Sequence, residues 1–419
     1  MPRNVVTRCL LSRLGLRAAH RAVLALALSL GLPAIASAAD PFGRCLQSVR
    51  ASKRARSITS STWKYIEGVR PDSAVLFQLN AQPEFRLPIW DYIAVMVDQE
   101  RIEDGVRLMS QYRAVFDTVS YRYRVDASVV AAVWGVESNY GRGIGTFPVL
   151  RSLATLACEG RRQAYFRGEL IAALRIVQAG HIPADQFRGS WAGAFGQTQF
   201  MPGVFWGRAV DFDGDGRRDL MANTGDALAS AANYLRIAGW RTGVPWGIEV
   251  RLPQTDSVAF STRGEGRRVR RRLSVWTQRG IVRADGAPLA DSASDSILTA
   301  GLFTPAGPRG PAFLVTTNFD AVYRYNAAES YTLAILHLAD RLAGGAPFVT
   351  PWPTDDDGLS RAERRELQAL LGARGHPIGV IDGLLAPATR AAVRLEQQRL
   401  GHAVTGRPGQ RLLRALRAP

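Results

Sequence analysis

One carboxylate in this 419-residue chain stands at the end of an apolar segment with helical spacing. Residues 134–141 read Trp-Gly-Val-Glu-Ser-Asn-Tyr-Gly, and the carboxylate is Glu137. Asp126 is an N-cap type of residue, and apolar residues recur after it with the period of a helix. The sequence therefore predicts a helix that begins at Asp126 and that Gly141 can stop.

The surroundings of Glu137 favour one kind of chemistry. Glu137 lies one turn beyond Val133 and Trp134, so its neighbours on that helix face are largely apolar. An apolar environment disfavours the charged form of a carboxyl group and keeps it protonated near neutral pH. A protonated carboxyl is what a general acid needs in order to act on a glycosidic oxygen. The alternative is a helix-terminal glutamate that only caps or pairs locally.

Further motifs follow along the chain and give Glu137 a context. They occupy residues 189–202 (GSWAGAFGQTQFMP), 211–216 (DFDGDG), 232–235 (ANYL), 318–319 (NF) and 323–326 (YRYN). In this order, the set resembles the lytic murein transglycosylase B family, whose members cut the glycan strands of peptidoglycan. The resemblance runs from Phe42 to Leu342 and rests on several independent motifs in register.

The resemblance implies roles for residues around the carboxylate. Groups that line the family's glycan groove match Ser190, Gln199, Tyr234, Tyr325 and Asn326. The amide and hydroxyl groups would hydrogen-bond the sugar, and the tyrosine rings would offer amphipathic faces to it. Basic residues that the family places near the muropeptide match Arg161 and Arg162.

The motifs offer one carboxylate where a hydrolase needs two. Glycosidases that use water pair an acid with a second carboxylate, whereas residues 189–202 contain no acidic residue. The resemblance implies that Glu137 protonates the bond between N-acetylmuramic acid and N-acetylglucosamine and then serves as base. The C6 hydroxyl of the substrate closes a 1,6-anhydro ring, and no cofactor takes part in catalysis. The alternatives are a lysozyme-like muramidase and an inactive wall-binding scaffold.

Residues 211–222 have the pattern of an EF-hand calcium loop. Acidic residues stand at oxygen-ligand positions and glycine at the sharp turn, namely Asp211, Asp213, Asp215, Asp219 and Gly216. The last ligand position, normally an acid, is Ala222. The four aspartates predict a structural calcium site, and the alternatives are a weak site, a sodium site or an acidic turn without a metal.

The N-terminal segment, residues 1–38, has the composition of a secretory signal peptide. It contains five arginines and no acidic residue, then an apolar run and the small-residue sequence Ala36-Ser37-Ala38. The run is too short for a transmembrane anchor. We therefore expect a soluble mature protein in the periplasm.

Export also bears on the cysteines. Cys9 lies in the leader, so Cys45 and Cys158 are the two that remain after its removal. In an oxidising compartment they predict one disulfide. The alternative is a pair of buried free thiols.

The charge balance indicates the kind of partner. Loss of the leader arginines lowers the formal charge from +17 to +12, which still attracts polyanions. Export argues against nucleic acid and favours peptidoglycan strands, with other wall-remodelling proteins as further candidate partners. The basic residues 267–272 are expected to lie on a solvated loop or strand edge.

The predicted fold class is mainly α, with a lysozyme-like α+β catalytic domain over residues 39–346. Apolar residues recur at helical spacing in residues 163–179, 226–238 and 330–342. Residues 249–315 have short β-like runs, at 270–276 and 296–303, and are expected to form a small inserted subdomain.

The C-terminal region differs from the rest in composition. Residues 347–358 are rich in proline and aspartate and predict a linker. Residues 359–419 resemble the three-helix peptidoglycan-binding module of wall hydrolases, with Asp382 and Gly383 in the turn between two amphipathic helices. The linker predicts a module independent of the catalytic domain. The alternative is a helical dimerisation tail.

Overall fold

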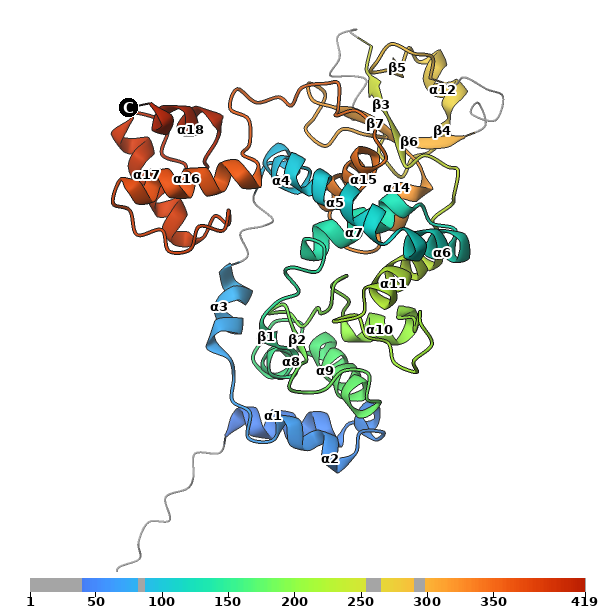
Figure 1. Cartoon of the computed structure of the whole chain (residues 1–419), viewed down its shortest axis with the longest axis vertical. Coiled ribbons are helices and arrows are strands. Elements are labelled where there is room, and N and C mark those ends of the chain that lie inside the picture. Colours follow the sequence, from blue (N-terminus) through green and yellow to red (C-terminus); the bar gives the residue numbers. More distant parts are fainter. Residues whose placement is uncertain (1–39, 82–86, 254–264, 290–297, 419) are drawn as a thin grey trace, which may run out of the picture. The chain divides into compact units, whose positions relative to one another are not determined.

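Helices make up most of the computed structural model, which describes residues 40–81, 87–253, 265–289 and 298–418 (Figure 1). The expected export leader, residues 1–38, lies outside these ranges. Within them, no helix has the length and apolar character needed to cross a membrane. The mainly helical class with a small β-containing part is confirmed.

The first buried core lies around helices α8 (Val149–Cys158) and α9 (Gln163–Gln178), which pack on each other. Its other elements are α1 (Pro41–Ala51), η1 (Lys53–Ala55), α2 (Ser60–Trp63), η2 (Lys64–Ile66), α3 (Ser73–Ala81) and α10 (Pro202–Arg208). The apolar side chains of α8 and α9, such as Leu153 and Leu170, are fully buried in this core. Helix α9 covers the segment that periodicity predicts.

The second core surrounds helix α7 (Ala127–Ser138), which carries Glu137. It is formed by α4 (Ile89–Met96), α5 (Gln99–Gln111), α6 (Arg113–Tyr123), α11 (Thr224–Ile237), α14 (Thr317–Tyr323) and α15 (Glu329–Leu342). Helix α7 packs against α5, α6, α11 and α15 (Figure 1). Seven consecutive residues, Val129 to Gly135, are buried, so α7 is apolar on all sides and not only on one face.

At neither end of α7 does the residue expected from the sequence act as a simple cap. Asp126 occupies the N-cap position, but its carboxylate accepts a hydrogen bond from Trp240 Nε1 at 3.1 Å instead of capping the helix. The helix ends before the expected Gly141, because Asn139 and Tyr140 both adopt the left-handed conformation, with φ of 51° and 60°. Left-handed asparagine is a common helix terminator.

In the described part of the chain, the β-strands form two small antiparallel sheets. Strands β1 (Phe147–Pro148) and β2 (Arg188–Gly189) form one pair. The other sheet has the order β4-β6-β7-β3-β5, from β3 (Gly247–Arg251), β4 (Arg271–Arg272), β5 (Val282–Arg283), β6 (Thr299–Phe303) and β7 (Ala312–Val315). The prediction of a β-like run at residues 270–276 is wrong for its second half, which forms part of α12 (Leu273–Gln278). The run at 296–303 yields β6, and residues 296–297 lie outside the described ranges.

The basic cluster at residues 267–272 is less exposed than the sequence predicts. Arg267 is 9% exposed and bonds to both Asp320 and Glu329 at 2.8 Å. Arg270 also donates to Asp320. These ion pairs join the chain before β4 to α14 and α15, so the prediction of a solvated loop is wrong for Arg267. The alternative of a strand edge is confirmed for Arg271 and Arg272, which form the edge strand β4.

Three helices form the C-terminal module, as predicted: α16 (Arg361–Ala373), α17 (Pro387–Arg399) and α18 (Gln410–Arg417). Ser360 and Glu363 make a capping box at the start of α16. Leucines from α16 and α18, including Leu367, Leu371 and Leu413, close a separate small core with Val393 of α17.

Two arginines of this module form buried ion pairs with α4 and α5. Arg407 Nε and Nη2 each donate to the Asp91 carboxylate at 2.7 Å. Arg361 Nε donates to Asp98 Oδ2 at 2.6 Å. The Asp91 and Asp98 side chains are 3% and 2% exposed. Because removing one partner of a buried pair costs about 3–5 kcal/mol, these contacts oppose the independence that the linker composition predicts.

Cys45 of α1 and Cys158, the last residue of α8, form a disulfide with a Cα–Cα distance of 5.8 Å. The bridge spans a sequence separation of 113 residues and encloses α7 and Glu137 within its loop. It therefore restricts the unfolded chain over the whole segment that leads to the candidate acid.

Loss of this bridge should destabilise the protein by about 2–4 kcal/mol in free energy of unfolding, because the unfolded chain regains the entropy of a long loop. The measurement is urea unfolding of wild type and of the double variant Cys45→Ser, Cys158→Ser, each with and without reductant. Reductant should weaken wild type and leave the double variant unchanged. Two titratable thiols in the denatured, unreduced wild type would contradict the bridge.

Candidate active site

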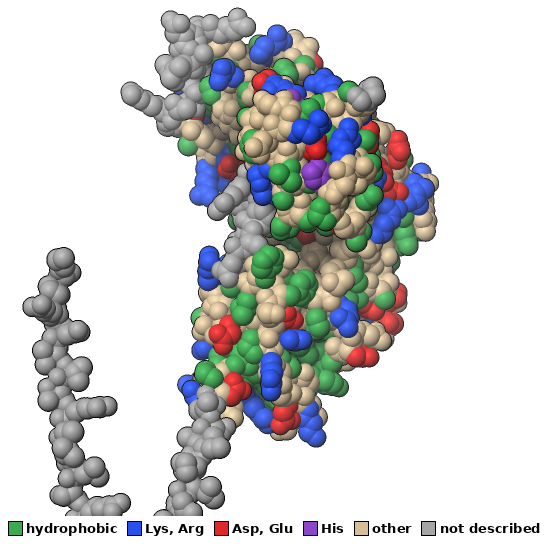
Figure 2. Space-filling model, turned by 90° about the vertical axis from the view of Figure 1, so that its left-hand side faces the viewer, with side chains coloured by type: hydrophobic (Ala, Val, Ile, Leu, Met, Phe, Trp, Pro, Cys, Tyr) green, Lys and Arg blue, Asp and Glu red, His purple; other side chains and the backbone are tan. Residues whose placement is uncertain are grey.

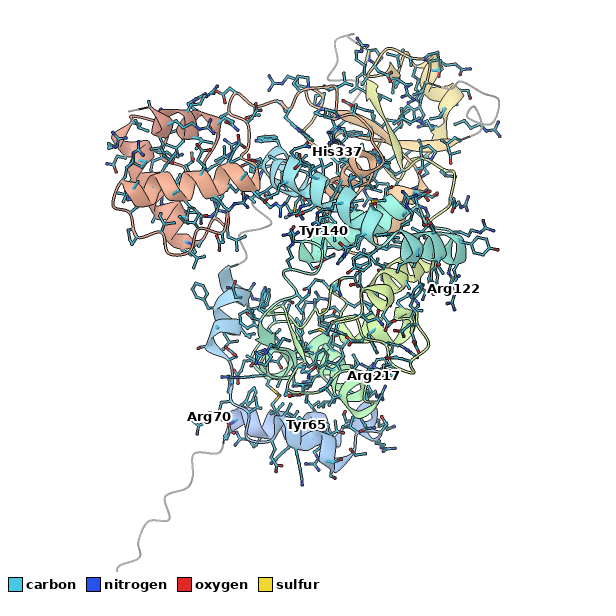
Figure 3. All side chains as sticks on the ribbon, in the orientation of Figure 1. Tyr65, Arg70, Arg122, Tyr140, Arg217 and His337 are labelled. Carbon is cyan, nitrogen blue, oxygen red and sulfur yellow. A yellow bond between two sulfur atoms is a disulfide. The ribbon has the colours of Figure 1, made fainter. Side chains whose placement is uncertain are left out.

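Glu137 lies in the last turn of α7, and α5 holds that turn from one side. Arg101 of α5, which is buried, donates through Nη1 to the Gly135 carbonyl oxygen at 2.5 Å. Tyr140, labelled in Figure 3, follows α7 and donates its hydroxyl to the Arg101 carbonyl oxygen at 2.9 Å. Position 135 requires glycine, because a Cβ there would lie 2.7 Å from the Tyr140 ring.

A tyrosine from a distant helix contacts the Glu137 carboxyl group directly. Tyr331, in the first turn of α15, donates its hydroxyl to Glu137 Oε1. Glu137 Oε2 accepts no hydrogen bond within the described part of the chain, so this oxygen remains for a ligand. Burial raises the pKa of Glu137 to about 7, and the Tyr331 hydrogen bond acts in the opposite direction. Near neutral pH a large fraction of the carboxyl is therefore protonated.

Tyr325 and Tyr234 form an aromatic pair on the Tyr331 side of the site. Burial, and next the Glu137 charge, raise the pKa of Tyr325 well above its ordinary value. The Tyr325 and Tyr234 rings have centroids 4.6 Å apart, and Phe200 packs against both. The Tyr325 hydroxyl donates to the Thr198 carbonyl oxygen at 2.7 Å, and the Tyr234 hydroxyl donates to the Arg324 carbonyl oxygen. Since both hydroxyls have protein acceptors, the ring faces are what a sugar could meet.

The glycine-rich segment 189–202 is a tight loop that packs on the end of α7. The Ser138 hydroxyl donates to the Gln197 carbonyl oxygen at 2.5 Å. Phe195 is fully buried inside the loop, with its ring edge-on to Phe187 at 4.8 Å. A Cβ at Gly189 would lie 2.2 Å from a carbonyl oxygen across the loop, so only glycine permits this close backbone approach.

Ser190 and Gln199 belong to this loop, and each keeps one group for a ligand. Ser190 Oγ accepts a hydrogen bond from Ala194 N at 3.1 Å, which leaves its hydroxyl proton to donate. Gln199 Nε2 donates to the carbonyl oxygens of Ile144 at 3.0 Å and Gly196 at 2.8 Å. These two hydrogen bonds fix the Gln199 side-chain amide and therefore also the orientation of its oxygen.

The remaining predicted sugar contacts are exposed. Asn326 follows Tyr325 directly, and Arg161 and Arg162 precede α9. The Arg162 guanidinium lies over the Tyr165 ring at 4.6 Å. No hydrogen bond in the described ranges joins Asn326 or Arg162 to Glu137.

The acidic loop after α10 brings carboxylate oxygens of three aspartates close together. Asp211, Asp213 and Asp226 each place a carboxylate oxygen within 4.8 Å of the others. All the aspartates of the loop accept backbone N–H groups, including Asp215 from Arg217 N and Asp219 from Met221 N and Ala222 N. Asp226, which was not among the predicted ligands, thus lies close to two of the four aspartates that the sequence pattern proposes.

Asp226 adds a carboxylate next to a loop whose last EF-hand position is an alanine. It is fully buried in the first turn of α11 and accepts hydrogen bonds from Phe212 N at 2.8 Å and Asp219 N at 2.6 Å. Burial, and further the charges of Asp213 and Asp211, raise the pKa of Asp226 to about 6. Clustered carboxylate oxygens suit a hard divalent cation, which would offset their mutual repulsion. The residues present thus fit calcium.

Comparison with known proteins shows the family of this chain. Residues 41–340 match the transglycosylase SLT domain, and residues 360–416 match a peptidoglycan binding domain. The chain belongs to the transglycosylase SLT domain family. By that membership it is a peptidoglycan lytic transglycosylase, which confirms the resemblance seen in the sequence motifs.

Three relatives show the range of similarity. The membrane-bound lytic murein transglycosylase B of Escherichia coli K12 is 29% identical over 259 residues, which cover 60% of this chain and 66% of that protein. SltB3 of Pseudomonas aeruginosa, solved with NAG-anhNAM-pentapeptide, is 44% identical over 90% of this chain and 100% of its own, with a TM-score of 0.71. Escherichia coli Slt35, solved with calcium, is 25% identical over 73% of this chain and 94% of its own, with a TM-score of 0.61.

Two residues of the site escaped the sequence reading for different reasons. Tyr331 contacts Glu137 across 194 residues, and no local pattern distinguishes it from other tyrosines at the start of a helix. Asp226 carries a usable signal, because it follows Asn223 with the spacing of a helix cap at the end of the acidic loop. An acid just beyond an incomplete EF-hand loop is therefore worth testing as its missing ligand.

Tyr331→Phe should move the alkaline limb of the activity profile to higher pH. The variant removes the hydrogen bond that holds the pKa of Glu137 down, so its pKa rises further above about 7 and the acid stays protonated longer. The measurement is kcat/KM on soluble glycan strands between about pH 5 and 9. The exposed Tyr121→Phe is the control. An unmoved limb in Tyr331→Phe would contradict the assignment of Glu137 as the titrating acid.

Proposed function

We propose that Glu137 acts first as general acid and then as general base in a non-hydrolytic cleavage of peptidoglycan. The bond cut is the β-1,4 link between N-acetylmuramic acid and N-acetylglucosamine. Glu137 gives its proton to the glycosidic oxygen as the bond from that oxygen to muramic C1 breaks. The C6 hydroxyl of the same N-acetylmuramic acid then bonds to C1 and gives its proton to the Glu137 carboxylate. The product ends in 1,6-anhydro-N-acetylmuramic acid, and no water is consumed.

One observation carries this proposal: the Glu137 carboxyl is buried, has a raised pKa and has a tyrosine hydroxyl as its hydrogen-bond partner. Burial and the Tyr331 hydrogen bond account for its pKa, and no second carboxylate of the described residues contributes to it. Retaining and inverting hydrolases place a second carboxylate about 5–10 Å from the acid. A single carboxyl is sufficient where the attacking hydroxyl already belongs to the bound substrate.

The same geometry leaves the muramidase as the second candidate. After protonating the glycosidic oxygen, the Glu137 carboxylate could deprotonate a water molecule in place of the C6 hydroxyl. Such an enzyme would yield a reducing muramic end instead of an anhydro end. The chemical form of the new chain end separates the two candidates.

We assign the substrate contacts to the loop and the tyrosine pair next to Glu137. Ser190, Gln199 and Asn326 would hydrogen-bond N-acetyl and hydroxyl groups, and Tyr234 and Tyr325 would stack on sugar rings. Arg161 and Arg162 would meet the anionic part of the muropeptide farther along the strand. Lys and Arg side chains are scattered across the face in Figure 2, which suits an anionic polymer.

The chain organisation that we propose follows the export route. Residues 1–38 direct export and are removed, which places the protein in the periplasm. Residues 39–346 form the catalytic domain and 347–358 the linker. Residues 359–419 bind peptidoglycan and raise the enzyme concentration on the polymer.

We also propose that the acidic loop holds a structural calcium ion. Asp211, Asp213 and Asp226 would supply its carboxylate ligands. The similar Slt35 has been solved in complex with calcium, which supports this proposal. Bound calcium would stiffen the connection between α10 and α11, since the three ligands come from both ends of the loop.

Glu137→Gln should abolish new chain ends from purified sacculi, because the amide is nearly isosteric yet neither gives nor takes the proton. General acid–base steps contribute about 10²–10⁴-fold. Mass spectrometry should find wild-type ends about 18 mass units lighter than reducing ends, since ring closure replaces the addition of water. Activity above about a tenth of wild type in the variant would remove Glu137 from the central role. Predominantly reducing ends would favour the muramidase.

Calcium should raise the melting temperature, because a ligand that binds only the folded state stabilises it. Asp213→Ala removes a clustered carboxylate and should abolish the response. Asp215→Asn is the matched control, since Asp215 lies outside the cluster, and it should retain the response. If millimolar calcium leaves the wild-type melting curve unchanged, or if the Asp213→Ala response equals that of wild type, the site is not the one proposed.

A further inference from the structure

The end of α7 meets the C-terminal module at Arg361. Arg361 is the first residue of α16, and its side chain is 15% exposed. Nη1 donates to the Asn139 side-chain oxygen at 2.7 Å. Nε and Nη2 donate to the two carboxylate oxygens of Asp98 at 2.6 Å and 3.2 Å. All three guanidinium nitrogens are therefore engaged with residues outside the module.

Asn139 is the residue that ends the helix carrying Glu137. It is the C-cap of α7, in the left-handed conformation, and its N–H donates to the Gly135 carbonyl oxygen at 3.0 Å. A left-handed residue other than glycine persists where its surroundings hold it there. The hydrogen bond from Arg361 is one such restraint, and it acts two residues from Glu137.

Asp98, the other partner of Arg361, supports the same turn from α5. It is the N-cap of α5 and accepts a hydrogen bond from Arg101 N at 2.8 Å. Arg101 in turn donates to the carbonyl oxygen of Gly135 in α7. Arg361 therefore links two routes to the last turn of α7, one through Asn139 and one through α5.

We propose that Arg361 is a positioning residue for the transglycosylase reaction, because it fixes the last turn of α7, and with it Glu137, through Asn139 and Asp98. This inference rests on the proposed role of Glu137. It gives the peptidoglycan-binding module a second task. The module supplies the side chain that completes the support of the catalytic helix, in addition to holding the enzyme on the wall.

A second arginine of the module separates positioning from docking. Arg407 forms a two-pronged pair with Asp91 of α4, similar in burial and geometry to the pair of Arg361 and Asp98. In the described ranges, Arg407 makes no hydrogen bond to a residue of α7 or to Asn139. Both arginines thus form an ion pair with a buried aspartate, but only Arg361 contacts the end of the helix that carries Glu137.

The test compares Arg361→Met with Arg407→Met in the full chain, on short soluble glycan strands. Both variants should lower the melting temperature, because each leaves a buried carboxylate without its partner. Only Arg361→Met should lower kcat, by about tenfold or more, since displacement of a catalytic group by a fraction of an ångström has effects of this size. KM should change less than about twofold, because the sugar contacts lie elsewhere.

The pH profile supplies a readout that docking alone would not move. A looser turn admits water to the Glu137 carboxyl, so the alkaline limb should move to lower pH in Arg361→Met. Tyr331 and Tyr325, the titratable groups that face Glu137, are unchanged in this variant. Arg407→Met should keep the wild-type limb.

Asn139→Gly decides the matter if Arg361→Met fails to fold. Glycine adopts the left-handed conformation freely, and the ion pair of Arg361 with Asp98 is kept, so only the hydrogen bond to position 139 is lost. Asn139→Gly should lower kcat as Arg361→Met does. The double variant should be no worse than the poorer single one, because the two changes remove one shared interaction.

The inference is overturned if Arg361→Met and Asn139→Gly are folded and keep the wild-type kcat and pH profile. An equal loss of kcat in Arg361→Met and Arg407→Met would also overturn it, since docking would then explain both. Failure of the proposed function looks different, because Glu137→Gln would then remain active. An inactive Glu137→Gln beside a wild-type-like Asn139→Gly leaves Glu137 as the acid and removes only the role of Arg361.

Discussion

A carboxyl group stays protonated near neutral pH only where protein atoms replace the water around it. At Glu137 this condition needs a helix that is packed on all sides up to its last turn, and Val129 to Gly135 meet it without a break. The chain must then leave the helix sharply so that the carboxyl remains reachable, which the left-handed Asn139 and Tyr140 achieve. One carboxylate oxygen contacts Tyr331, and the other remains for a ligand.

Elements on different sides of α7 all help to keep Glu137 in this packed environment. Helix α15 brings Tyr331, α5 brings Arg101, and the glycine-rich loop packs against Ser138. Each contact fixes a backbone or side-chain atom within one turn of Glu137. Because three of the elements are far apart in sequence, the site forms only when the second core has closed. Catalytic geometry and the stability of that core are therefore coupled.

Local sequence patterns predicted the helices whose apolar residues recur at helical spacing. Helices α7, α9, α11 and α15, and the place of Glu137 on the first of them, follow from such patterns. The β-like residues before Trp276 form a helix instead, because Leu273 and Trp276 are three apart and enter the same small core. Tyr331 and Arg361 could not be predicted, since their roles depend on partners that the fold brings from 194 and 222 residues away.

The buried arginine pairs of the C-terminal module limit how freely this protein can be recombined. A chimera with a foreign wall-binding module would lack arginines at the places of Arg361 and Arg407 unless they were built in. Asp91 and Asp98 would then face the graft as buried charges without counterions. Enzyme and anchor must therefore vary together in sequence at these four positions. A library of exchanged modules would keep its function mainly among members that retain both arginines.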